Sequence, residues 1–224
     1  MEQITFISEN DTVFIIDEDL VACNSLSRLI DSMGLRHECF ASSEEFLSSY
    51  VPGRAGCVIT DYRMVGMSGI ELLEELTNRE SALAVVMLTA DGSIPVAVKA
   101  IQSGAIAFLE KSCTENELWQ AIKDAIKSNH SRLQEKHDWD LIRVTLSSLT
   151  DQERTVLELV VEGQGNKQIA LKLDLSLRTV EHRRQKVKQK LKVGSNAELV
   201  RYYDYACTFE KNSMLRPSKS PIHE

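Results

Sequence analysis

Residues 57–69 have the sequence CVITDYRMVGMSG, which is typical of a strand running into a functional loop. Residues 57–60 are a short apolar run of the kind that forms a strand covered on both faces of a sheet, and Asp61 follows it directly. Strand-like runs recur at residues 13–16, 36–40, 83–88 and 107–109, and amphipathic helical stretches separate them. Between residues 11 and 128 the sequence therefore predicts an α/β fold, a doubly wound five-stranded parallel sheet.

Polar residues with a shared chemistry follow four of these runs. Asp17 and Glu18 follow the first run, Asp61 the third, Thr89 the fourth, and Lys111 lies just beyond the fifth. Ligands of doubly wound sheets bind beyond the carboxyl ends of the strands, so these side chains are expected to converge. Three carboxylates at one edge repel each other, and a hard cation such as Mg²⁺ relieves that repulsion. A carboxylate beside such a cation can attack a phosphoryl group whose oxygens the metal and a lysine neutralise.

The segments Thr60-Asp61-Tyr62-Arg63-Met64 and Met67-Ser68-Gly69, together with these residues, resemble the receiver domain of two-component response regulators. The resemblance covers residues 11–128 and implies a flavodoxin-like receiver fold with Mg²⁺ as cofactor. It also implies individual roles: Asp61 as the phosphoacceptor; Asp17, Glu18, Asp61 and the carbonyl of Arg63 as metal ligands; Thr89 and Phe108 as the switch pair; and Lys111 as a phosphate contact.

Two positions depart from the receiver pattern, which has proline where this chain has Val65 and Ser112. A cis peptide bond before Ser112 would cost about 2.5–4 kcal/mol, compared with about 1 kcal/mol before a proline. Either the loop carries that strain or Lys111 sits differently. Glu18 is longer than aspartate by one methylene group. The departures leave open an alternative, a phosphate-independent regulator controlled by constitutive dimerisation or by a protein partner.

Residues 149–206 have the pattern of a small all-α domain. Thr150 and Glu153 have the spacing of a capping box at a helix start, and Gly163 and Gly165 are expected to end that helix. Asn166 is expected to cap a short second helix, and Ser176 to cap a third. Two helices joined by so short a turn predict a helix-turn-helix.

The expected third helix has Val180, Val187 and Leu191 on one face and seven Lys and Arg residues over much of the rest. A helix of this kind can lie in the major groove of DNA. The segments Asn166-Lys167-Gln168-Ile169-Ala170 and Arg178-Thr179-Val180-Glu181 resemble the LuxR-type helix-turn-helix of NarL/FixJ regulators. By position, the resemblance implies base contacts from Glu181, His182 and Gln185, and backbone contacts from Lys167, Arg178, Thr179, Arg184 and Lys188. The family often has histidine at Arg183, and two alternatives remain open: a protein-binding module with a solvated basic helix, and a packed, neutral His182.

Charge is distributed unevenly along the 224 residues. Residues 1–128 contain nine Lys and Arg against 20 Asp and Glu, a net charge of −11, whereas residues 129–224 contain 17 against 13, a net charge of +4. The basic half is therefore expected to bind a polyanion.

Residues 1–10 lack the order of a secretory signal, no apolar run approaches the roughly 20 residues of a membrane span, and the five cysteines form no C-x-x-C pair. We expect a cytoplasmic protein with reduced cysteines.

These features together predict a DNA-binding response regulator with four segments: a receiver domain at 11–128, a partly helical linker at 129–148, a LuxR-type domain at 149–206 and a flexible tail at 207–224. A sensor histidine kinase or a small phosphodonor is expected to phosphorylate Asp61. The active form is expected to be a homodimer that binds double-stranded DNA, with residues 195–206 pairing the DNA-binding domains. Since the second domain shows no catalytic spacing, we expect a stoichiometric switch rather than an enzyme.

Overall fold

The computed structural model describes residues 8–90 and 92–214, with side chains as far as residue 207. Its contacts divide the chain into two compact units, residues 1–134 and 135–224. Helix α5, Glu115–Ser147, runs through the boundary, so the polar segment expected to be a partly helical connector is helical up to residue 147. Residues 1–7, which include most of the stretch considered as a signal sequence, lie outside the described part.

The first unit contains the predicted five-stranded parallel sheet, whose strands are β1 Thr12–Ile16, β2 Arg36–Phe40, β3 Gly56–Asp61, β4 Ala84–Thr89 and β5 Ala107–Glu110. Their order in the sheet is β2-β1-β3-β4-β5. Of the three inner strands, β1 and β4 are buried along their whole length, and β3 is buried except at its last residue, as their apolar sequences predicted. The sequence interpretation of the fold is therefore confirmed.

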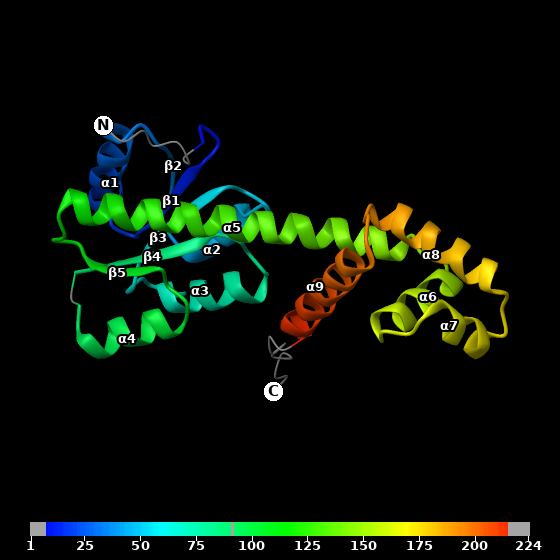
Figure 1. The fold of residues 1–224 in the computed structure, drawn as a ribbon. Helices are drawn as coiled ribbons and strands as arrows, with labels where there is room; N and C mark the ends of the chain where they lie inside the picture. The colour runs from blue at the N-terminus through cyan, green and yellow to red at the C-terminus, as the bar shows by residue number, and fades with distance from the viewer. Residues whose placement is uncertain (1–7, 91, 215–224) are drawn as a thin grey trace. The chain divides into compact units, whose positions relative to one another are not determined.

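Helices cover both faces of this sheet (Figure 1). Helix α1, Leu20–Ser32, and the first part of α5 bury Ile30, Ile122 and Ile126 against one face. On the other face lie α2, Ser43–Ser49, α3, Gly69–Asn78, and α4, Ile94–Gln102. Each loop that enters a helix on this second face comes from the carboxyl end of a strand, so the same loops that start the helices form the edge where a ligand would bind.

The second unit is built from α6, Asp151–Val161, α7, Asn166–Leu173, α8, Leu177–Leu191, and α9, Asn196–Met214. The apolar face predicted for the third helix is buried, with Val180, Val187 and Leu191 at most 3% exposed. The turn between α7 and α8 is tight because Asp174 takes a left-handed conformation, with φ of 51°. Residues 207–214, expected to be part of a flexible tail, are helical, and residues 215–224 lie outside the described part.

Two of the three predicted caps in this unit are present. Thr150 and Glu153 form the reciprocal capping box of α6, and the Ser176 hydroxyl accepts from the amide of Thr179 at the start of α8. The predicted cap of α7 is wrong, because Gly165 holds the cap position and its amide donates to the Gln168 side chain at 2.9 Å. Asn166 lies one residue inside the helix, where its side-chain oxygen accepts from Arg184 instead.

No helix in the described residues is long and apolar enough to span a bilayer.

Candidate functional site

Three of the predicted side chains meet at the carboxyl edge of the sheet. The ammonium nitrogen of Lys111 lies 2.6 Å from Oδ2 of Asp17 and 2.6 Å from Oδ2 of Asp61. The two carboxylates come from neighbouring strands, since Ile16 at the end of β1 pairs with Thr60 of β3. Their side chains are only 3% and 12% exposed, respectively, so the lysine neutralises a pair of largely buried acids.

Local hydrogen bonds aim each carboxylate at the lysine. Oδ1 of Asp17 accepts from the amide of Asp19 at 2.9 Å, and Oδ1 of Asp61 accepts from the amide of Arg63 at 3.0 Å. Each acid therefore keeps one oxygen on its own loop and turns the other toward Lys111. Such turns form readily where an aspartate side chain bonds to the backbone two residues ahead.

Lys111 reaches this position without a proline after it. The peptide bond between Lys111 and Ser112 is trans, and the amide of Lys111 donates to the carbonyl of Thr89 at 2.7 Å, which extends the pairing of β4 with β5. Burial opposes the charge of the ammonium, but the hydrogen bonds to Asp17 and Asp61 outweigh it, so the pKa of Lys111 is raised. Of the two arrangements that the sequence left open, the strained cis bond is absent from the structure.

Glu18 does not join this group. Its Oε2 accepts from the backbone amide of Val65 at 2.8 Å, and its side chain is exposed. Within the described residues there is accordingly no cluster of three or more His, Cys, Asp or Glu side chains arranged to hold a metal ion. The structure thus assembles two of the three carboxylates that the sequence predicted to converge.

The donors present are nevertheless suited to Mg²⁺. Asp17 and Asp61 direct hard oxygen atoms at one cationic centre, which Lys111 provides, and Mg²⁺ takes oxygen ligands of this type while retaining several waters. Arg63 lies two residues beyond Asp61 in the same loop, with its amide fixed by the Asp61 carboxylate. The oxygen atoms of Asp17 and Asp61 are therefore of a kind that fits the metal, while Glu18 is held by the Val65 amide.

Thr89 and Phe108 lie on the same face of the sheet. Phe108 pairs with Met87, two residues before Thr89, and side chains two apart on a strand share a face. Thr89 is buried, while Phe108 is partly buried against the cluster that includes Met87 and Ala100. Thr89 therefore lies on the face of the sheet that this cluster covers.

The surface next to Phe108 is unusually apolar. Ile94, Val98 and Ile101 of α4 are 80%, 49% and 50% exposed, and their spacing places them on one side of the helix. A shallow groove beside them is lined by Ala97, Val98, Ile101, Gln102 and Phe108.

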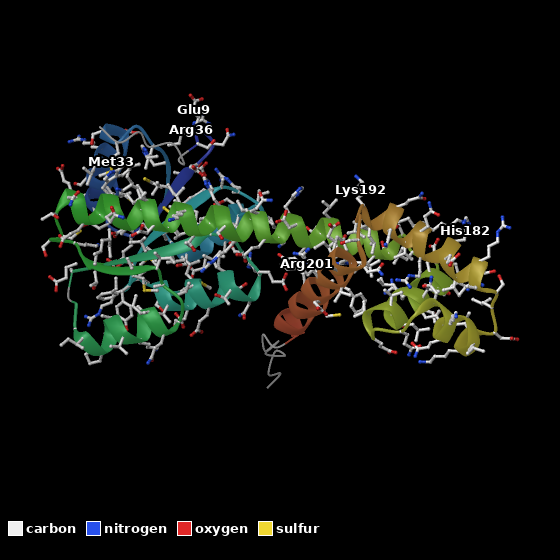
Figure 2. The ribbon with its side chains drawn as sticks, in the orientation of Figure 1. Glu9, Met33, Arg36, His182, Lys192 and Arg201 are labelled. Atoms are coloured by element: carbon white, nitrogen blue, oxygen red, sulfur yellow. The ribbon has the colours of Figure 1, made fainter. Side chains whose placement is uncertain are left out.

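In the second unit, most residues predicted to contact DNA surround one groove. This groove, with a volume of about 810 Å³, lies between the start of α7 and the exposed face of α8. Five of the eight predicted residues line it: Lys167, Glu181, Arg184, Gln185 and Lys188. Arg178 and His182 are exposed outside it, and His182 points away from α6 and α7 (Figure 2). Thr179 is different, because its hydroxyl lies 2.7 Å from that of Ser176 at the helix cap.

Some cations of α8 are held by the protein itself. Lys190 donates to Glu153 at 2.6 Å and to the carbonyl of Ser148 at 2.9 Å. Arg183 donates to the Gln152 side chain at 2.7 Å. Both belong to the seven Lys and Arg residues that the sequence places outside the apolar face of this helix. Helical spacing is the signal that could have distinguished these held cations from the exposed ones, because Lys190 lies three residues after the buried Val187 and so close to the buried side of the helix.

Arg184 lines the groove but is also partly buried and hydrogen-bonded within the protein. Its guanidinium donates to the Asn166 side chain, and burial lowers the pKa of Arg184 from its ordinary value while leaving the group charged. The bond ties α8 to the first residue of α7. Arg184 therefore fixes the shape of the groove as well as contributing charge to it.

Comparisons with known proteins agree with both halves of this description. Residues 13–123 match the family model of the response regulator receiver domain, and residues 147–203 match that of bacterial regulatory proteins of the luxR family. The chain is 38% identical over 193 residues to the transcriptional regulatory protein FixJ of Azorhizobium caulinodans, covering 86% of this chain and 92% of that one. It is 36% identical to the response regulator protein TmoT of Ectopseudomonas mendocina, with 86% and 88% covered.

Solved structures give the same result. The response regulator StyR is similar with a TM-score of 0.78 and 39% identity, covering 87% of this chain and 98% of that one. Full-length FixJ from B. japonicum is similar with a TM-score of 0.53 and 33% identity, covering 90% and 99%. The chain therefore belongs to the NarL/FixJ family of response regulators, in which a receiver domain is followed by a LuxR-type DNA-binding domain.

Proposed function

We propose that this response regulator is controlled by phosphorylation of Asp61, and that the phosphorylated form dimerises and binds two-fold sites in double-stranded DNA. The observation that carries the proposal is the position of Lys111 within 2.6 Å of both Asp17 and Asp61. It supports phosphorylation over the phosphate-independent alternative, because Lys111 reaches the site despite Ser112.

Asp17, Asp61, Glu18 and the carbonyl of Arg63 would hold Mg²⁺. When bound, the metal would supply positive charge to the oxygens of the transferred phosphoryl group. One oxygen of the Asp61 carboxylate attacks phosphorus as the bond to the donor breaks, which yields an aspartyl phosphate and the released donor group. The donor is a phosphohistidine of a sensor kinase or a small acyl phosphate.

Lys111 and Thr89 then act on the phosphoryl oxygens. The ammonium of Lys111 already faces Asp61 and pairs with the added negative charge. The hydroxyl of Thr89 donates to a phosphoryl oxygen, and the space it leaves is taken by Phe108 turning inward. Because Phe108 borders the groove beside α4, this rotation reshapes the exposed apolar surface of Ile94, Val98 and Ile101. We assign dimerisation to that surface.

The DNA-binding step uses the groove between α7 and α8. Glu181, His182 and Gln185 of α8 face the base edges, while Lys167, Arg178, Thr179, Arg184 and Lys188 lie toward the phosphates. Dimerisation raises the apparent affinity because the second domain binds its half-site at a high effective concentration. Each protein molecule takes one phosphoryl group and acts as a stoichiometric switch.

The test is to incubate the full chain with Mg²⁺ and acetyl phosphate, or with beryllofluoride, and to measure intact mass and oligomeric state. An Asp61→Asn variant is the control. Covalent phosphate and a dimer induced by the mimic, both lost in the variant, are expected. Absence of both in the unmodified chain would favour the phosphate-independent alternative and leave DNA binding unaffected.

A further inference from the structure

Glu18, one of the proposed Mg²⁺ ligands, is already engaged in a hydrogen bond with Val65. This bond joins two loops at the carboxyl edge of the sheet, the loop after β1 and the loop between β3 and α3. The acceptor is Oε2 of Glu18 and the donor is the backbone amide of Val65, at 2.8 Å. Asp17, the neighbour of Glu18, faces Lys111 in the same structure.

We propose that the Val65 amide competes with Mg²⁺ for the Glu18 carboxylate and thereby weakens metal binding by this receiver. The inference rests on the proposed function, because it takes Glu18 as a ligand. In the structure Oε2 of Glu18 accepts from this amide and Glu18 is not grouped with Asp17 and Asp61, so in this proposal its turn toward them breaks the bond. Each metal-binding event therefore includes the loss of a hydrogen bond to a charged acceptor, which is stronger than one between neutral groups.

The backbone of residue 65, rather than its side chain, makes this contact. The Val65 side chain is 83% exposed and has little packing to lose. Every residue except proline supplies an amide hydrogen, so replacement by proline removes this donor while replacement by alanine keeps it. Position 65 thus offers a matched pair of variants.

The rest of the loop has its own anchors. Oε1 of Glu44 accepts from the amide of Met67 at 2.9 Å, and Asp61 accepts from the amide of Arg63 at 3.0 Å. Loss of the Val65 amide therefore removes the competitor of the metal and leaves the loop fixed on both sides of position 65.

The experiment is calorimetric titration of the full chain with MgCl₂ alone. Val65→Pro is expected to lower the Kd for Mg²⁺ about fivefold, and Val65→Ala to leave it unchanged. A double-mutant cycle separates competition from a change in loop shape. In a Glu18→Ala background, Val65→Pro is expected to have no effect on the Kd, since the carboxylate that the amide held is gone.

A second measurement needs no substitution. In NMR spectra of the unmodified chain, the Val65 amide is expected to shift and to exchange faster with solvent in step with Mg²⁺ saturation. An unchanged Val65 amide at saturation, or a Val65→Pro effect that persists without Glu18, would overturn the inference and leave the metal site standing. A chain that binds no Mg²⁺ would overturn the inference and the metal part of the proposed function together.

Discussion

The carboxylate of Glu153 in α6 lies 2.6 Å from the ammonium of Lys190 in α8, and Glu153 also closes the capping box of α6. A single glutamate, 5% exposed, thus joins the start of the first helix of the DNA-binding unit to the end of its basic helix. The angle at which α8 is presented depends on this contact and on the helix packing beneath it.

We first predict that Lys190→Met lowers the free energy of unfolding of the second unit by about 1–3 kcal/mol, because it leaves a buried carboxylate without its cation. Hydrogen exchange of the full chain, followed by mass spectrometry, is expected to show faster exchange in α6 and α8. Lys186→Met, an exposed change on the same helix, serves as control. Equal exchange rates in the two variants would mean that the ion pair does not contribute to the free energy of unfolding of this unit.

The same contact gives a pH dependence. The hydrogen bond from Lys190, followed by that from the Thr150 amide, holds the pKa of Glu153 below its usual range. A depressed carboxyl pKa stabilises the folded state above the pKa of the unfolded chain, near 4.5, and this stability is lost as the pH falls through the folded pKa. Thermal unfolding is expected to show Glu153→Gln less stable than the unmodified chain at pH 6, with the difference shrinking below pH 4.5. A difference that stays constant down to pH 3 contradicts this.

At the acidic site, we predict that Lys111→Met slows phosphorylation of Asp61 by acetyl phosphate roughly tenfold or more, because a fixed positive charge is lost next to the transferred group. Mg²⁺ binding is expected to persist, since Lys111 is not a ligand. Rates are measured by intact mass at saturating Mg²⁺, with Glu110→Gln as control. An unchanged rate would assign Lys111 a purely structural role.

For the DNA-binding groove, we predict that Lys167→Ala weakens binding to all sequences alike and reduces the slope of log affinity against log salt by about one. Lys172 lies on the same helix but pairs with Glu162 at 3.8 Å and does not line the groove. Lys172→Ala is therefore expected to leave the slope unchanged. Fluorescence anisotropy with a target and a random duplex measures both, and equal slopes for the two variants would contradict the assignment.

The apolar surface of α4 gives the last prediction. Ile101→Asp is expected to abolish dimerisation induced by beryllofluoride, because it places a charge on the exposed apolar face. Light scattering with and without the mimic measures this. Val51→Asp, at a site 58% exposed, is the control and is expected to dimerise normally. A dimer that survives Ile101→Asp would place the interface elsewhere.

The sequence by itself determined the sheet, the helices of the second unit and the position of Asp61 at a strand end. Buried parallel strands must be apolar throughout, and the three-to-four-residue spacing of apolar side chains indicates which face of an amphipathic helix is buried. Both signals are local, so they can be read along the chain. The departures from the receiver pattern at Val65 and Ser112 could also be read from the sequence, but their effect on the conformation of the two loops could not.

The tertiary structure decided which polar groups meet. Lys111 bridges Asp17 and Asp61 without a proline after it, Glu18 turns to the Val65 amide, and Lys190 is held by Glu153 instead of facing outward. Each of these contacts joins residues at least 37 positions apart, and a long polar side chain has several partners within reach. The choice among partners depends on distance and burial in the folded chain, which local sequence does not encode.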